Sequence, residues 1–146
     1  MTPKEYLTEF QNIRHKRKLY SKMMESIDEE CISIGGVDYK DRVKSSPQND
    51  PIGNIVIGLI NKKASLGLKV AQLRAQELIV ENQILAMNEI NPEYSEIIFY
   101  RYVSDFGWKA ICEATNFSRT QVNRLHGEAL KKMDELFNIS SKIGFF

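Results

Sequence analysis

Apolar residues recur every three or four positions through most of the chain, which is the period of an α-helix. The first such stretch has heptad spacing with one polar interruption, as in a coiled coil. Its stripe comprises Tyr6, Phe10, Ile13, Arg17, Tyr20, Met24, Ile27, Cys31 and Ile34. Thr2 as N-cap, Pro3 as the first helical residue and Glu5 as the second member of a capping box predict its start. Gly35 and Gly36 predict its end.

A second stretch predicts another long helix, which begins at Asp50 and Pro51 and ends near residues 88 to 90. Its stripe comprises Val56, Leu59, Lys63, Leu66, Val70, Leu73, Glu77, Val80, Ile84 and Met87. Four further apolar residues lie outside this stripe: Ile60, Leu78, Ile79 and Leu85. They exceed what one partner helix covers, so we expect a third helix or a second copy of the chain to pack there. Gly58 and Gly67 either weaken this helix or allow a partner helix to approach closely.

The two long helices are predicted to form an antiparallel hairpin. The polar segment 37–50 links them, and it is longer than most helix–helix connections. Its extended length of about 50 Å equals that of a helix of roughly 35 residues, so a parallel return would be taut. We therefore expect residues 1–90 to form a coiled-coil-like hairpin and, through the surplus apolar surface, a dimer or larger homo-oligomer.

A third helix is predicted to begin at Asn91. This residue suits the N-cap, Pro92 suits the first helical position, and Glu93 lies near the positive end of the helix dipole. The apolar stripe of this helix comprises Tyr94, Ile97, Ile98, Tyr102 and Val103. The segment 104–107 interrupts the pattern and predicts the end of the helix.

The next two helices are predicted to form a helix-turn-helix. A short helix from about Trp108 to Thr115 ends at Asn116, which suits a left-handed turn. Ser118 and Gln121 match a capping box, and Phe117 is placed as the hydrophobic staple outside it. The stripe of the last helix comprises Val122, Leu125, Ala129, Met133 and Leu136. The fold class is therefore all-α, with a long hairpin followed by a three-helix unit in residues 91–137 and a tail in residues 138–146.

If Val122 and Leu125 face the core, the polar residues of the helix 118–136 face outward. The candidate base-contacting residues are Arg119, Thr120, Asn123 and Arg124, with Gln121 at the edge. Arginine pairs with guanine, Asn or Gln with adenine, and Thr contacts the thymine methyl group. Lys109 and Lys131 are the candidate phosphate contacts. The alternative interpretation is an ordinary helical hairpin with a solvated polar face.

This C-terminal sequence resembles region four of bacterial sigma factors. More closely, it resembles the small sigma-like transcriptional regulators of phages and prophages of Gram-positive bacteria, the ArpU/RinA type. The residues that match are Arg101-Tyr102, Trp108-Lys109-Ala110-Ile111, Phe117-Ser118-Arg119 and the run from Gln121 to Leu130. Residues 2–7 and 53–56 also look like that family. The chain departs from the pattern at Asn116, where the family usually has Gly, and at Gly107, where it usually has a Thr or Ser cap.

The resemblance implies sequence-specific binding to double-stranded DNA in control of phage genes, in the cytoplasm of a bacterial host. Contact with RNA polymerase is a second, less direct implication. Two alternatives stay open. A small terminase subunit also joins a helix-turn-helix to helical oligomerisation segments, but it serves DNA packaging. A helical adaptor would bind proteins only.

The charge of the chain gives no independent argument for nucleic acid, since the formal net charge is +1. Within residues 92–137 six Lys and Arg face seven Asp and Glu, so non-specific DNA affinity should be weak. A dimer, RNA polymerase or the basic run 14–18 would have to compensate. That run suits a phosphate-contacting patch or a solvated coiled-coil face, and its charges wrap around the helix, which favours the solvated face.

Several function classes are not expected from the sequence. No apolar run is long enough for a transmembrane helix, and charges interrupt the first apolar stretch, unlike in a signal peptide. Cys31 and Cys112 fall on apolar faces and are expected to be buried and unpaired. His15 and His126 are too far apart in sequence to suggest a metal site. No catalytic motif is recognisable, so we expect a protein that is not an enzyme and has no cofactor.

Overall fold

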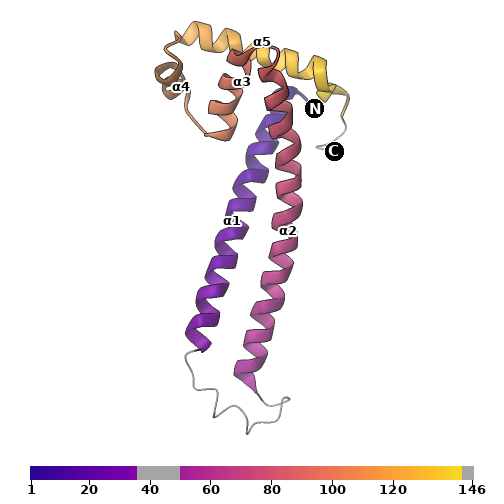
Figure 1. The fold of residues 1–146 in the computed structure, drawn as a ribbon, viewed down its shortest axis with the longest axis vertical. Coiled ribbons are helices and arrows are strands. Elements are labelled where there is room, and N and C mark those ends of the chain that lie inside the picture. Colours follow the sequence, from indigo (N-terminus) through magenta and orange to yellow (C-terminus); the bar gives the residue numbers. More distant parts are fainter. Residues whose placement is uncertain (36–49, 143–146) are drawn as a thin grey trace. The chain divides into compact units, whose positions relative to one another are not determined.

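The computed structural model describes residues 1–35 and 50–142, and the regular structure of these residues is all helical, with no strand (Figure 1). The elements are α1 (Pro3–Gly35), α2 (Pro51–Asn88), α3 (Pro92–Ile98), the π-helix η3 (Phe99–Val103), α4 (Trp108–Thr115), α5 (Arg119–Phe137) and the 3₁₀ turn η4 (Ile139–Ser141). The predicted all-α class is confirmed. Except for Asp50, the linker predicted over residues 37–50 lies outside the described residues. None of the described helices is long and apolar enough to cross a membrane.

Local capping explains where the long helices begin. The Oγ1 atom of Thr2 accepts a hydrogen bond from the amide of Glu5 at 3.2 Å, and the Glu5 carboxylate accepts one from the amide of Thr2 at 2.8 Å. These two bonds complete the predicted capping box and lower the pKa of Glu5. At α2, Oδ1 of Asp50 accepts from the amide of Gly53 at 3.0 Å. Both predicted starts are confirmed.

The described residues group into two compact units. One unit combines Met1–Arg14 with the chain from Ala75 onward, and the other comprises the described residues of His15–Arg74. The first turns of α1 and the last turns of α2 therefore belong with the helix-turn-helix. A separate oligomerisation domain over residues 1–90 and a DNA-binding domain over residues 91–137 stay functional predictions, because the compact units divide the chain at other positions.

Within the unit His15–Arg74, α1 and α2 are antiparallel. Asp28 forms an ion pair with Lys63, with 2.5 Å between Oδ1 and Nζ, while Met24 lies against Gly67. A lower residue number on α1 is thus paired with a higher one on α2, which is the order of antiparallel helices. A Cβ atom on Gly67 would lie 3.7 Å from the Met24 methyl group, which is ordinary contact, and one on Gly58 would meet open space. Neither glycine is therefore required for close approach of α1, and close approach of another helix stays a prediction.

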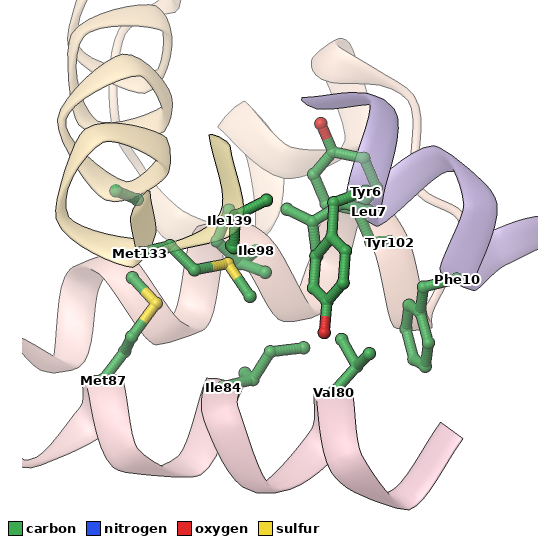
Figure 2. Close-up of a cluster of buried hydrophobic side chains, with 11 residues drawn as sticks. Tyr6, Leu7, Phe10, Val80, Ile84, Met87, Ile98, Tyr102, Met133 and Ile139 are labelled. Atoms are coloured by element: carbon green, nitrogen blue, oxygen red, sulfur yellow. The ribbon is translucent and has the colours of Figure 1, made fainter. Parts of the chain in front are cut away.

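The larger core of the other unit is built around the first turns of α1 (Figure 2). It comprises Tyr6, Leu7, Phe10, Val80, Ile84, Met87, Ile98, Tyr102, Ala129, Met133 and Ile139. Figure 2 shows the ring of Tyr6 between α1 and the last turns of α2. Its hydroxyl donates to Oε1 of Gln83 at 2.9 Å, which satisfies both buried polar groups. Residues from both ends of the chain therefore share one core.

The third predicted helix is not uniform, because its second half is the π-helix η3. The amide of Ser104 donates to the carbonyl of Phe99 at 3.0 Å, five residues back. The extra residue in this turn does not disturb the buried positions, since Ile97, Ile98 and Tyr102 are all in the core. The apolar pattern alone predicted a continuous α-helix, because a one-residue insertion at its end leaves the earlier spacing unchanged.

Two side chains of α1 bind the C-terminal carbonyls of η3. The guanidinium of Arg14 donates to the carbonyl of Val103, and Nε2 of Gln11 donates to the carbonyl of Arg101 at 3.0 Å. Gln11 also donates to Oδ1 of Asp105 at 3.0 Å. The last carbonyls of a helix have no partner within it, so these donors act as a cap from a distant helix. Arg14 is thus a structural residue, not part of a solvated coiled-coil face.

The end of α5 also differs from the prediction. Leu136 was expected in the buried stripe, but it is 41% exposed, and the stripe ends at Met133. Asn138 turns the chain with a left-handed backbone, and the carboxylate of Asp134 accepts from the amide and hydroxyl of Ser140 at 2.7 and 2.6 Å. This turn inserts Ile139 into the core, so the first residues of the predicted tail are structural.

Removing the Tyr6 ring should destabilise the helix-turn-helix, although the two are far apart in sequence. We expect Tyr6→Ala to lower the free energy of unfolding by about 3–5 kcal/mol, because a fully buried aromatic ring leaves a cavity. Tyr6→Phe should cost about 1 kcal/mol, the net value of one hydrogen bond. Urea unfolding followed by circular dichroism measures both. The exposed Leu19→Ala is the control, and an equal loss in Tyr6→Ala and Leu19→Ala would contradict this core.

Candidate nucleic-acid interface

The helix-turn-helix predicted from the sequence is present. The turn between α4 and α5 passes through Asn116, whose φ of 60° is the left-handed conformation expected there. Oγ of Ser118 accepts from the amide of Gln121 at 3.2 Å, and Oε1 of Gln121 accepts from the amide of Ser118 at 3.4 Å. The predicted capping box of α5 is therefore confirmed. Gly107 stands at the N-cap of α4 without a side-chain hydrogen bond.

A second apolar cluster holds α3, α4 and α5 together. Its buried members are Ile97, Ile111, Val122 and Leu125, and Tyr94, Tyr100, Phe106, Trp108, Cys112 and Phe117 pack around them. Val122 and Leu125 face this cluster, as the sequence predicted. The opposite face of the first turns of α5 is consequently directed away from the core. Cys31 and Cys112 are unpaired, as expected, but both are half-buried and not fully buried.

The structure leaves every candidate DNA-contacting residue exposed. On α5 these are Arg119, Thr120, Gln121, Asn123, Arg124 and Lys131, and on α4 there is Lys109. No side-chain hydrogen bond or ion pair with another described residue is formed by four of them: Lys109, Thr120, Asn123 and Lys131. The side-chain oxygen of Gln121 is engaged in the capping box, which leaves its NH₂ group for other contacts. Most of the predicted set is therefore available for a partner.

Arg124 has one weak intramolecular partner. Its guanidinium lies 3.8 Å from the carboxylate of Glu128, and the Arg124 side chain is 61% exposed. Pairs of this kind between residues four apart on a helix contribute about 0.3–0.5 kcal/mol. The hydroxyl of Tyr94 donates to the other oxygen of Glu128 at 3.0 Å, and this bond raises the pKa of Tyr94. Arg124 can therefore exchange this partner for another anion or a base at little cost.

Arg119 is oriented by a contact that the sequence did not predict. Its guanidinium carbon lies 5.2 Å from the centre of the Trp108 ring, and that of Arg101 lies 4.4 Å from the same ring. Arg101 also donates to the carbonyl of Phe106 at 3.1 Å, within the segment that connects η3 to α4. Two cations thus share one indole across three elements. The sequence resemblance included Arg101 but gave it no role, since no local spacing relates it to Trp108.

His126 lies behind this indole and is partly buried. Its Nε2 atom is 2.9 Å from the hydroxyl of Tyr102, and the edge of its ring faces Trp108, with 4.9 Å between ring centres. Burial lowers the pKa of His126 to about 4, and the positive charges of Arg101 and Lys4 add to this effect. The ring is therefore neutral at pH 7. With the proton on Nδ1, the Tyr102 hydroxyl donates to Nε2.

The same unit contains a cavity away from the exposed face of α5. A cavity of about 620 Å³ lies between the end of α2, α3 and η3, and Glu81, Leu85, Glu96 and Phe99 are among its lining residues. None of the candidate DNA-contacting residues lines it. Among the described residues, no group of His, Cys, Asp and Glu side chains is arranged to hold a metal ion.

Comparison with protein-family models, curated proteins and solved structures found no match to this chain. The resemblance to phage regulators therefore rests on the matching residues alone.

The neutral His126 predicts a loss of stability in mild acid. Its pKa is lower in the folded chain than in the unfolded chain, so the unfolded chain binds more protons between pH 6.5 and about 4. Stability is thus highest above pH 6.5, and the His126 contribution falls by roughly 1–2 kcal/mol as the pH falls through this window, after allowance for solvent screening. Urea unfolding at several pH values measures this slope.

His126→Gln removes the titrating ring and should flatten the slope. The matched control is Asn123→Gln, which changes an exposed residue of the same helix that does not titrate and should keep the slope of the parent chain. If His126→Gln and the parent lose stability equally between pH 6.5 and 4.5, His126 is not the group responsible.

Proposed function

We propose that this chain is a sequence-specific DNA-binding transcriptional regulator of phage or prophage genes, with α5 as its recognition helix. The observation that supports the proposal most is the exposed polar face at the start of α5, which has few intramolecular partners. A recognition helix contacts base edges with the residues of its first turns.

The exposed side chains match the donor and acceptor pattern of a major groove. Arg119 and Arg124 suit the O6 and N7 acceptors of guanine, Asn123 suits adenine, and Thr120 suits a thymine methyl group. Contact with the Trp108 ring restricts the rotamers of Arg119 before DNA binds, which lowers the entropy lost on binding. Lys109 and Lys131 are proposed to contact phosphates.

Gly127 lies on the same face and has no role inside the chain. It follows Asn123 by four residues and Arg124 by three, so the three share one side of α5. A Cβ atom at this position would meet nothing within 4 Å. A glycine inside a helix costs about 1 kcal/mol relative to Ala, and packing does not explain it here. We infer that Gly127 leaves room for close approach of the DNA backbone.

The charge of the helix-turn-helix limits the DNA affinity of a single copy. Residues 92–137 have six basic and seven acidic side chains, so phosphate neutralisation by this segment is small. Base contacts from a single recognition helix do not replace that missing affinity. We propose that two or more copies bind together, and that contact with RNA polymerase is a second source of affinity at a promoter.

The base-contacting roles of Asn123 and Arg124 are tested by alanine substitution. On a site selected from fragments of the source genome and then footprinted, Asn123→Ala and Arg124→Ala should each weaken binding by about 1–3 kcal/mol. Folding should change by no more than about 0.5 kcal/mol, because both residues are exposed. Fluorescence anisotropy measures binding, and circular dichroism checks the fold.

Two further substitutions give the contrast. Lys109→Gln and Lys131→Gln should weaken all sequences alike and reduce the salt dependence of binding by about one charge each. Val122→Asp should unfold the unit, because it buries an unpaired charge. If Asn123→Ala and Arg124→Ala bind the footprinted site as tightly as the parent chain, α5 does not contact the bases, and the protein-binding adaptor becomes the better hypothesis.

Gly127→Gln should affect folding and DNA binding in opposite directions. Glutamine favours a helix over glycine by about 0.5 kcal/mol, so the melting temperature should rise slightly. Binding should weaken by roughly tenfold, comparable to one lost base contact, since the side chain occupies the space between helix and DNA. Thermal melting and anisotropy measure the two effects. Unchanged affinity would show that this part of α5 lies outside the complex.

A further inference from the structure

The outer half of α2 in the unit His15–Arg74 has no charged residue. The charged residues between Pro51 and Arg74 are Lys62, Lys63, Lys69 and Arg74, and all lie within about 90° of the direction toward α1 at the helical period. Lys63 forms the ion pair with Asp28, and Lys69 lies over the ring of Tyr20 at 5.8 Å. The outer half consists of Asn54, Ile57, Gly58, Asn61, Ala64, Ser65, Leu68, Ala71 and Gln72, all exposed. We call it the outer face of α2.

This distribution is the reverse of that of an ordinary surface helix, in which charged residues lie opposite the core. The neighbouring part of α1 shows the ordinary pattern. Its exposed residues include Lys16, Lys18, Lys22, Glu25, Glu29 and Glu30. Both helices belong to the same unit and pack against each other, so the difference between them is not one of general composition. It indicates that the outer face of α2 is suited to an uncharged partner surface.

The apolar residues of the outer face follow a heptad line. Ile57, Ala64 and Ala71 are seven residues apart, and Asn61 and Leu68 alternate with them in steps of four and three. Ile57 is 58% exposed and Leu68 is 70% exposed, so the line presents large apolar side chains among uncharged neighbours. The alanines permit close approach of another helix. Asn54 and Asn61, seven residues apart, are the polar residues of this line, and an asparagine in such a line sets the register of self-associating helices at a cost in stability.

We propose that the outer face of α2 is the contact between two copies of this chain. A helix with charged residues would leave them buried and unpaired against this face, at a cost of several kcal/mol. The outer face of a second copy has no charge, so the two surfaces are complementary in this respect. The residues beside the heptad line are Gly58, Ser65 and Gln72 on one side and Ile60 and Gly67 on the other, and none of them is charged, so like charges do not meet within the contact. Lys62 and Lys69 lie beyond Gly58 and Ser65, at the border with the side that faces α1.

Two substitutions on the outer face should change the association in opposite directions. Leu68→Glu places like charges in the contact and should raise the dimer dissociation constant by roughly 100-fold or more. Asn61→Leu replaces the asparagine at the middle of the heptad line with an apolar residue and should lower that constant by roughly tenfold. Sedimentation equilibrium of the full chain over a range of micromolar concentrations measures both. Because both positions are exposed in the single chain, neither substitution should lower its helix content by circular dichroism.

One control substitution lies on α2 next to the outer face, and the other lies on α1. Lys62→Gln alters the flank of the same helix, and Glu25→Gln alters the charged face of α1; both should leave the dissociation constant within about threefold of the parent value. A parent chain that stays monomeric at tens of micromolar overturns the proposal, and so does a dimer that Leu68→Glu and Asn61→Leu leave unchanged. This contact would supply the second copy that the proposed function calls for, but these experiments contain no DNA, so a failure of the contact is distinguishable from a failure of base recognition by α5.

Discussion

The packing of the first turns of α1 against the end of α2 and the inner side of α5 is the contact on which the helix-turn-helix depends. Tyr6, Leu7 and Phe10 share one core with Ala129 and Met133, which lie on the inner side of the proposed recognition helix. Small domains bury a small share of their surface and are only marginally stable, and residues 1–14 add apolar surface to the core that the helix-turn-helix shares. Contacts between the two ends of the chain thus hold α5 in place.

The same docking determines the local structure that faces outward. Arg14 and Gln11 bind the last carbonyls of η3. The segment that follows this π-helix is bound in turn by Arg101, which donates to the carbonyl of Phe106. From there Arg101 reaches the ring of Trp108, against which Arg119 of the recognition helix also packs. The partly buried His126 lies on the inner side of that ring. It is neutral, so it adds no positive charge beside the two arginines. Cations at the surface are thereby held close together without a buried charge.

The slightly acidic helix-turn-helix and the uncharged outer face of α2 both relate to the need for more than one copy. The helix-turn-helix segment is slightly acidic, so one copy has little general affinity for DNA, and the proposed function needs binding by more than one copy. The outer face of α2 has the apolar, uncharged surface that such an assembly uses, in a unit that includes none of the candidate DNA contacts. Self-association and DNA contact are therefore proposed to use different surfaces of the same chain.

The sequence by itself determined what depends on neighbouring residues. The helix starts at Pro3, Pro51, Pro92 and Arg119 follow from caps within four residues, and the outward set on α5 follows from the position of Val122 and Leu125. The tertiary structure decided what depends on distant partners: the π-turn bound by Arg14, the burial of Ile139 in place of Leu136, the arginines on Trp108 and the neutral state of His126. Contacts between groups on different elements have no periodic signature, whether the partners are 7 positions apart, as Arg101 and Trp108 are, or 90, as Gln11 and Arg101 are. Only the folded chain brings such groups within reach of each other.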